Sequence, residues 1–170
     1  MGEAGQAPPR PEPPPVGDER EQLTGLLDFL RATVVWKSRG LTDAQARRSL
    51  VGSELTTVAN LVAHLRHTEE FWFCVVLDGR PDAWAHMYGD EEYDFRRGAR
   101  TPLAQLIAEY QAQCEISREI AAARPLDHEV WHGERRFNAR WIVLHLIDET
   151  ARHAGHLDLL REMLDGVTGE

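Results

Sequence analysis

The fold is decided by one long stretch, residues 138–166, which reads NARWIVLHLIDETARHAGHLDLLREMLDG. Its apolar residues recur with the period of an α-helix, and at about 100° per residue they form one stripe. That stripe consists of Ile142, Leu146, Leu157, Leu160 and Leu164. Asn138 is a candidate N-cap and Gly166 a candidate end. The stretch therefore predicts a single long amphipathic helix.

Three other stretches show the same helical period, at residues 21–40, 56–79 and 101–125. The last of these opens with Thr101 as a candidate N-cap and Pro102 at the first helical position, which is a favourable helix start. Four long amphipathic helices joined by short or polar segments pack most economically side by side. The sequence therefore predicts an all-α fold, a four-helix bundle.

The segments between and before these helices differ in composition. Residues 1–20 hold six of the nine prolines and almost no large apolar side chains, so burial cannot offset the entropy of ordering them. We expect a disordered, proline-rich tail at 1–20 and one bundle domain at 21–170. The linker 80–100 is rich in acids and aromatics and is expected to cover one end of the bundle. The linker 125–137 is expected to hold at most a short extended piece, and no sheet is predicted.

Composition argues against several classes of function. The formal net charge is −9, which is opposite to the basic footprint of a nucleic-acid binder. No apolar run approaches the roughly 18 residues of a membrane helix, and the tail lacks the apolar core of a signal peptide. Cys74 and Cys114 form neither a disulfide framework nor a CxxC site, so buried thiols are expected. We expect a cytoplasmic protein that binds neither nucleic acid nor membranes.

Polar residues interrupt the apolar stripe of residues 138–166. On the helical wheel Glu149 and His153, four residues apart, fall in the middle of the stripe, and His145 and His156 fall at its edge. An unpaired buried carboxylate costs several kcal/mol, so Glu149 needs a partner. A cation held by Glu149 and His153 from one helix face would supply that partner.

A third ligand is expected from residues 56–79, where His64 borders the apolar stripe and His67 is rotated toward solvent. Two histidines and one carboxylate leave a position open for water, as in catalytic zinc sites. His145 and His156 would then support the ligands or line the mouth of the site. A metal-free alternative stays open at this point. In that alternative an arginine of a neighbouring helix pairs with Glu149, and a backbone carbonyl binds His153.

Residues 128–132, HEVWH, match the HExxH pattern of zinc metalloproteases. The pattern works when one face of a helix presents both histidines. Here Pro125 lies three residues upstream and Gly133 follows at once, so no long helix can run through the motif. We therefore expect the metal at His64, Glu149 and His153 and not at this motif.

Three stretches resemble a known family, and they read GLTDAQARRSL (40–50), LVAHLRHTEEFWF (61–73) and RWIVLHLIDETARHAGHLDLLREMLDG (140–166). They look like the DinB-like superfamily, and more narrowly its branch related to mycothiol-dependent maleylpyruvate isomerase and mycothiol or bacillithiol S-transferases. The resemblance covers about residues 21–166. It implies a four-helix bundle with metal ligands at His64, Glu149 and His153. Many members carry HxxxH in the last helix, where this chain has Glu149 at the first ligand position.

The resemblance also implies an activity. We expect a divalent-metal-dependent S-transferase that adds a small thiol such as mycothiol to small electrophiles, with His156 or His145 relaying a proton. Zn²⁺ is the expected ion, with Ni²⁺, Mn²⁺ or Fe²⁺ as alternatives, and the resemblance implies a homodimer. The rival hypotheses are a metal-dependent hydrolase at the same site and a non-enzymatic metal-containing binding or stress-response module. Dependence of turnover on an added thiol separates the three.

Overall fold

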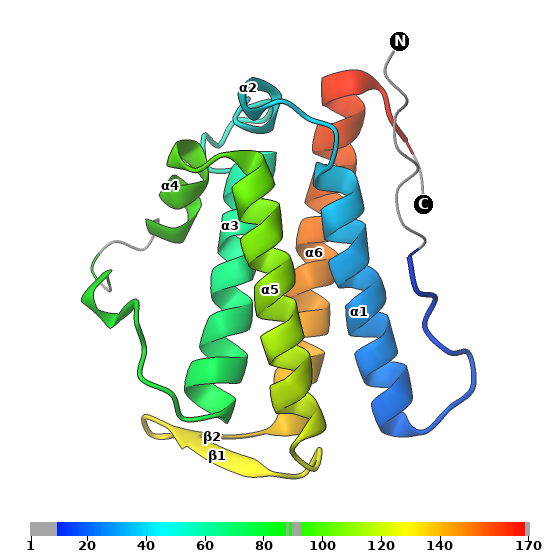
Figure 1. The fold of residues 1–170 in the computed structure, drawn as a ribbon, viewed down its shortest axis with the longest axis vertical. Coiled ribbons are helices and arrows are strands. Elements are labelled where there is room, and N and C mark those ends of the chain that lie inside the picture. The colour runs from blue at the N-terminus through cyan, green and yellow to red at the C-terminus, as the bar shows by residue number, and fades with distance from the viewer. Residues whose placement is uncertain (1–9, 88, 90–92, 169–170) are drawn as a thin grey trace.

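The computed structural model describes residues 10–87, 89 and 93–168. Four long helices form its body, and these are α1 (Glu19–Ser38), α3 (Val58–Glu69), α5 (Leu103–Ala122) and α6 (Ala139–Asp165). Figure 1 shows α1 and α6 running in one direction and α3 and α5 in the other. The structure thus confirms the predicted all-α four-helix bundle. Residues 1–9 of the expected tail lie outside the described residues.

Shorter elements complete the chain, and these are α2 (Asp43–Ala46), the π-helix η1 (Glu70–Leu77), the 3₁₀-helix η2 (Ala85–Met87), α4 (Tyr93–Arg100), β1 (Glu129–His132) and β2 (Arg135–Asn138). Among the four long helices α1 packs mainly against α6 and α3 mainly against α5, while α4 covers a further face of α3. Two clusters of buried apolar side chains fill the space between the helices, one toward the α2 end and one toward the hairpin end. η1 continues α3 directly, so α3 and η1 act as one long rod.

The helix ends follow local signals, with one exception. Asn138 accepts a hydrogen bond from a backbone N–H in the first turn of α6 at 2.8 Å, and Gly166 ends that helix with φ 74°, as predicted. α5 differs from the prediction, because Thr101 does not cap it. Instead the N–H of Leu103 donates to the Asp43 carboxylate of α2 at 2.9 Å. The carboxylate that stabilises this helix start therefore comes from a distant part of the sequence.

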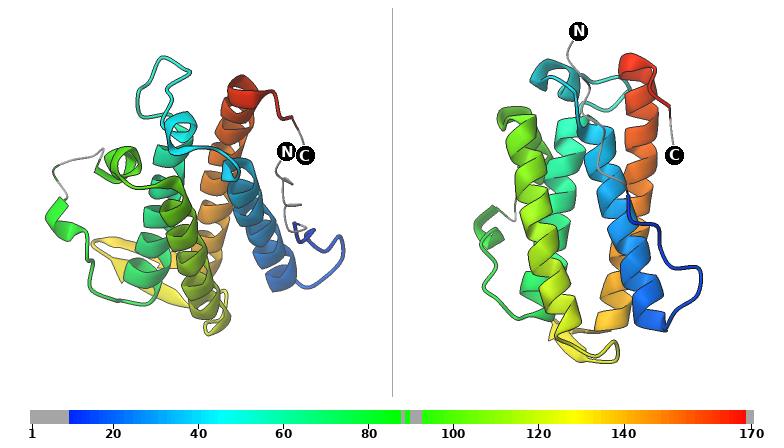
Figure 2. Two further views of the ribbon diagram at one scale, coloured as in Figure 1. Left: turned by 45° about the horizontal axis from the view of Figure 1, so that its top comes forward. Right: turned by 45° about the vertical axis from the view of Figure 1, so that its right-hand side comes forward.

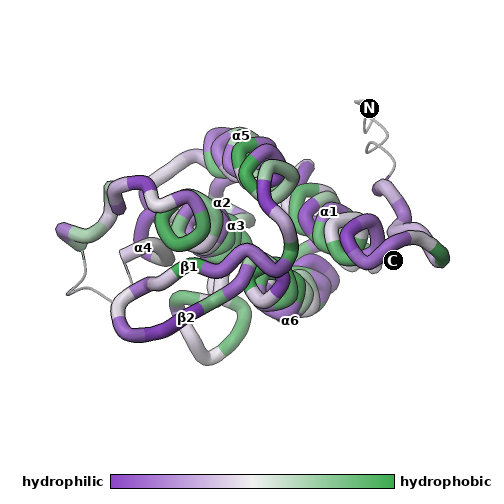
Figure 3. The backbone as a smooth tube through the Cα atoms, turned by 90° about the horizontal axis from the view of Figure 1, so that it is seen from below, coloured by the Kyte–Doolittle hydropathy of each residue, from purple (hydrophilic) through white to green (hydrophobic). Residues whose placement is uncertain are grey.

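A two-stranded antiparallel hairpin corrects the expectation that the linker 125–137 holds no sheet. β1 pairs with β2 so that Val130 lies opposite Phe137. Gly133 adopts φ 59° at the turn, a conformation that favours glycine. Phe137 is buried against the bundle, and the hairpin lies beneath the lower ends of η1 and α6 (Figure 3). Packing of the buried Phe137 and the partly buried Val130 on the bundle explains why such short strands form.

The described part of the linker 80–100 lies at the side of α3 rather than over one end of the bundle (Figures 1 and 2). Within it, α4 packs closely on α3. A Cβ atom at Gly98 would lie 2.5 Å from the carbonyl oxygen of Ala59, so only glycine permits this approach. Trp84 packs against His67 of α3, with ring centroids 5.6 Å apart. The expectation that this linker covers one end of the bundle is therefore corrected. Tyr88 lies outside the described residues.

The described part of the proline-rich segment lies along α1 (Figure 2). The Arg10 guanidinium lies over the rings of Phe29 and Trp36, 5.0 and 4.8 Å from their centroids, and donates to the Thr33 hydroxyl at 3.2 Å. α1 begins at Glu19, two residues inside the segment that was expected to be tail. Arg10 therefore contacts the outer face of α1 through two aromatic rings and one hydroxyl.

Two further expectations concern the cysteines and membranes. Cys74 and Cys114 are free and buried, as predicted. Burial is the main cause that raises the pKa of the Cys114 thiol, and the nearby charge of Glu69 raises it further. Among the described residues no helix is both long enough and apolar enough to cross a membrane.

Candidate metal centre

The three residues predicted as metal ligands come together where α3 faces α6. His64 lies on α3, and Glu149 and His153 lie one turn apart on α6. Their side chains are 18%, 20% and 12% exposed, respectively. The cluster is therefore held by packed helices and yet remains open to a small molecule from solvent.

One oxygen atom is the focus of the cluster. Glu149 Oε1 lies 2.9 Å from Nε2 of His64 and 3.1 Å from Nε2 of His153. The two imidazole rings meet edge to face with centroids 5.0 Å apart. One candidate ligand atom from each residue lies within 4.8 Å of the other two. Among the described residues the Glu149 carboxylate is hydrogen-bonded to two histidines, whereas the metal-free alternative expected an arginine as its partner.

Glu149 is ionised in this setting. Hydrogen bonds from His153 and then from His64 lower the pKa of the Glu149 carboxyl far below its usual range, although burial opposes them. A carboxylate oxygen between two imidazole nitrogens is an anionic acceptor. The site therefore attracts a proton or a cation.

The donor set fits a divalent cation. Zn–N and Zn–O bonds of about 2.0–2.2 Å in a tetrahedral site place neighbouring ligand atoms about 3.3 Å apart. The observed separations of 2.9 and 3.1 Å are a few tenths of an ångström shorter, so a small rotation of the Glu149 side chain opens the cluster to that size. Two imidazoles and a carboxylate suit Zn²⁺ and similar ions of intermediate softness.

His156 contacts His153 at the ring nitrogen that faces away from Glu149. Its Nδ1 is 3.2 Å from Nδ1 of His153, while Nε2 of His153 faces Glu149. Burial, followed by the nearby charge of His153, lowers the pKa of His156, which favours the neutral ring. A neutral His156 can accept the Nδ1 proton of His153, which leaves the Nε2 lone pair of His153 free for a metal. The contact places His156 next to a candidate ligand, on the ring nitrogen that does not face Glu149.

The other histidines stand apart from the cluster. His145 stacks on Trp141 with centroids 5.0 Å apart and an interplanar angle of 13°. His132 of the HEVWH motif lies on β1 and packs against Phe71, so the motif stands on a strand. Within the described residues, only the trio on α3 and α6 groups three side chains that can hold a metal.

The helical wheel misplaced the centre of the buried stripe on α6. Glu149 and His153 lie at its border, whereas Leu146, Thr150 and Leu157 are completely buried. The wheel was centred on large apolar residues, and small or polar residues also lie inside the bundle. Those residues are Val143, Thr150 and Ala154. The candidate ligands therefore project from the edge of the packed face, where solvent can reach them.

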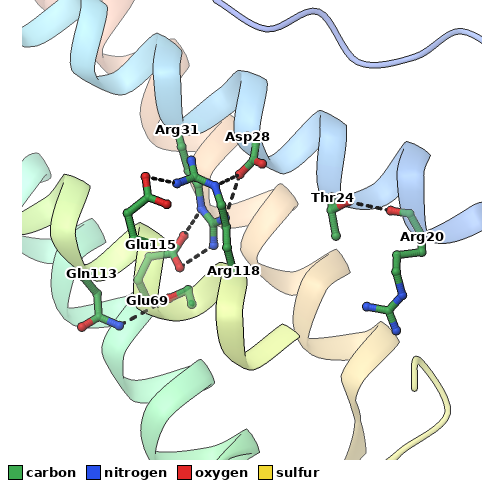
Figure 4. Close-up of polar contacts among 9 residues, drawn as sticks. Arg20, Thr24, Asp28, Arg31, Glu69, Gln113, Glu115 and Arg118 are labelled. Carbon is green, nitrogen blue, oxygen red and sulfur yellow. Dashed lines mark hydrogen bonds and ion pairs between the residues drawn. The ribbon is translucent and has the colours of Figure 1, made fainter. Parts of the chain in front are cut away.

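A buried ion pair was missed by sequence reasoning. Arg31 of α1 donates from Nε and Nη2 to both carboxylate oxygens of Glu69 on α3, at 2.7 and 2.6 Å. Figure 4 shows this pair extended by Asp28, which accepts from Arg31 and from Arg118 of α5 at 2.9 Å each. The pair crosses the core between three helices, and its role is structural.

Comparison with protein-family models finds one match, to the family described as MST, mycothiol-S-transferase, over residues 22–166. The matched region takes in nearly all of the four long helices and the hairpin. It agrees with the resemblance seen in the sequence and confirms it. No curated protein matches the chain.

Proposed function

Because the chain belongs to the mycothiol S-transferase family, we propose that it joins a mycothiol-type thiol to a small electrophile at the centre formed by His64, Glu149 and His153. The observation that carries the proposal is the single Glu149 oxygen approached by both imidazoles at a partly exposed site. A divalent cation bound there would lower the pKa of a thiol that reaches it.

In the proposed reaction the thiol gives up its proton to solvent or buffer. Its sulfur then forms a bond to an electrophilic carbon, and the leaving group departs with the electron pair of its bond. His64 and His153 contribute neutral donors and Glu149 contributes one negative charge. With a divalent ion the centre keeps a net charge of about +1, which still favours an incoming thiolate.

Zn²⁺ is the ion that we propose as resident, with Ni²⁺, Mn²⁺ and Fe²⁺ as alternatives. Two imidazole nitrogens and a carboxylate oxygen form the ligand type of catalytic zinc sites, which keep one position open. The same donors accept Ni²⁺ and Fe²⁺, because imidazole suits these two ions as it suits Zn²⁺. The carboxylate oxygen of Glu149 suits Mn²⁺. Metal analysis of protein purified without added metal identifies the resident ion.

The decisive experiment compares metal-stripped and Zn²⁺-loaded protein in an assay with mycothiol and monobromobimane. Turnover is expected only when both the ion and the thiol are present. Ester hydrolysis that does not depend on a thiol would replace the proposal with a hydrolase. Tight ligand binding without turnover of any electrophile would replace it with a binding module.

The position of His156 gives a separate prediction. His156→Ala is expected to weaken Zn²⁺ affinity by roughly 10- to 100-fold, because His153 loses the partner that fixes its Nδ1 proton and ring orientation. Competition titration against a chelator of known affinity measures the change. His86→Ala, at an exposed position on η2, serves as the matched control and should leave the affinity unchanged. Full affinity in the His156 variant would remove the orienting role.

We also propose that the protein is a cytoplasmic homodimer. Its buried free thiols suit a reducing compartment. Near its C-terminal end α6 leaves Leu159 and Met163 exposed four residues apart, so they form an apolar stripe typical of an interface. Light scattering at micromolar concentration should give the mass of a dimer, and Leu159→Glu should shift it to a monomer. A monomeric parent protein would contradict the proposal.

A further inference from the structure

Two rows of side chains face each other between α3 and α6. One row lies on a single face of α6, with members four residues apart, and consists of Trp141, His145, Glu149 and His153. The opposite row lies on α3 and its continuation η1 and consists of His64, Thr68 and Trp72. The metal centre occupies one end of these rows. Aromatic rings occupy the other end.

The aromatic end forms one connected surface, called the aromatic wall here and made of Trp72, Trp141 and His145. The ring centroids of Trp72 and His145 are 4.7 Å apart, and those of Trp72 and Trp141 are 5.1 Å apart. Trp141 remains 39% exposed, and the other two side chains are partly exposed. Aromatic rings thus stay accessible one and two helical turns from Glu149 along α6.

Elements behind the wall hold it rigidly. Phe137 of β2 is buried and packs on Trp72 and Trp141. Its ring centroid lies 5.3 Å from that of Trp72 and 4.8 Å from that of Trp141. Trp72 belongs to the π-helix η1, whose wider turns change the direction in which its side chains point. Such π-helical segments occur frequently at functional sites. The wall is therefore set before any ligand arrives.

We propose that the aromatic wall binds the electrophile and selects planar, electron-poor aromatic electrophiles; this inference rests on the proposed function. With a rise of 1.5 Å per residue, His145 and Trp141 lie about 6 and 12 Å from Glu149 along α6. A substituted benzene ring whose reactive carbon lies at the metal centre covers the nearer part of that distance and reaches His145, which stacks on Trp141. Electron-poor rings stack well on the electron-rich faces of indoles. The same electron deficiency makes the ring carbon reactive toward a thiol.

The kinetic test compares an aromatic and an aliphatic electrophile with the same thiol. With 1-chloro-2,4-dinitrobenzene the sulfur replaces chloride, and with iodoacetamide it replaces iodide. In both cases the halide takes the electron pair and the thiol proton goes to buffer. Trp141→Leu should raise KM for the aromatic substrate by about 2- to 10-fold, the range of one stacking contact, and leave iodoacetamide unchanged. Trp131→Leu is the control, because Trp131 is 69% exposed on the hairpin and should affect neither substrate.

A binding measurement separates this inference from the proposed function. 2,4-Dinitroaniline has the same kind of ring but no leaving group, so it reports binding without turnover. It should quench tryptophan fluorescence of the metal-loaded protein in a saturable way, and Trp141→Leu should weaken that binding whereas Trp131→Leu should not. Absence of thiol-dependent turnover with both electrophiles would overturn the proposed function. Binding of 2,4-dinitroaniline would still test whether the aromatic wall binds electron-poor rings.

Two results would overturn the inference. One is an equal loss with both electrophiles in Trp141→Leu, and the other is undiminished binding of 2,4-dinitroaniline by that variant. Thermal unfolding followed by circular dichroism checks that the variant is folded. If Trp141→Leu unfolds, Trp141→Phe replaces it, because phenylalanine keeps an aromatic face of smaller area. The Phe variant should then show a smaller KM increase for the aromatic substrate and none for iodoacetamide.

Discussion

Glu149→Gln is expected to reduce the affinity for a divalent cation by more than roughly 100-fold. Loss of a residue that only hydrogen-bonds a metal ligand costs up to about 100-fold, and Glu149 is itself a candidate ligand. Glutamine keeps the size and one oxygen of glutamate but removes the negative charge. That charge faces two imidazole nitrogens at 2.9 and 3.1 Å in a partly desolvated site, where charge interactions are stronger than in water. Turnover should fall together with metal occupancy.

Metal retained after dialysis against increasing chelator concentrations measures this effect. Asp148→Asn is the matched control, because the neighbouring Asp148 is exposed and pairs with Arg152 instead of a histidine. A second control, His132→Ala, removes one histidine of HEVWH and should keep the metal. The assignment fails if Glu149→Gln retains metal as the parent does, or if His132→Ala loses it.

Sequence periodicity located the candidate metal centre because its key relation is local. Residues i and i+4 of one helix always share a face, so Glu149 and His153 were placed together without knowledge of the fold. His64 was added as a polar residue on the border of a second stripe. The role of His156 was not predictable in this way. Its Nδ1 contact with His153 depends on side-chain rotamers, which a helical wheel does not contain.

The fold was predictable where a pattern repeats over many residues. The four long helices have that property, and the hairpin does not, because each strand has four residues and its apolar packing on the core rests on Val130 and Phe137. The π-helical form of residues 70–77 was also missed. That segment, EFWFCVVL, is apolar on nearly every side, so its sequence carries no periodic signal that separates one helix type from another.

Arg31→Met is expected to lower the free energy of unfolding by about 3–5 kcal/mol, because it leaves the buried Glu69 carboxylate without its partner. Burial opposes the charge on Arg31, but the charge of Glu69 raises the pKa of the guanidinium above its usual value. The Arg31 guanidinium is therefore charged in the folded protein. Urea unfolding measures the change. Arg152→Met removes an exposed partner of Asp148 and should cost less than about 1 kcal/mol.

The double variant Arg31→Met/Glu69→Leu tests why the pair matters. Two apolar side chains of similar volume need no compensating charge, so the double variant should recover most of the stability lost by Arg31→Met. Recovery would show that the cost comes from the unpaired Glu69. If the double variant is as unstable as the single one, the loss instead comes from packing between α1 and α3. In that case metal affinity shows whether α3 has moved. Glu69 lies on the same helix as His64, so a shift of α3 would displace this candidate ligand and weaken metal binding.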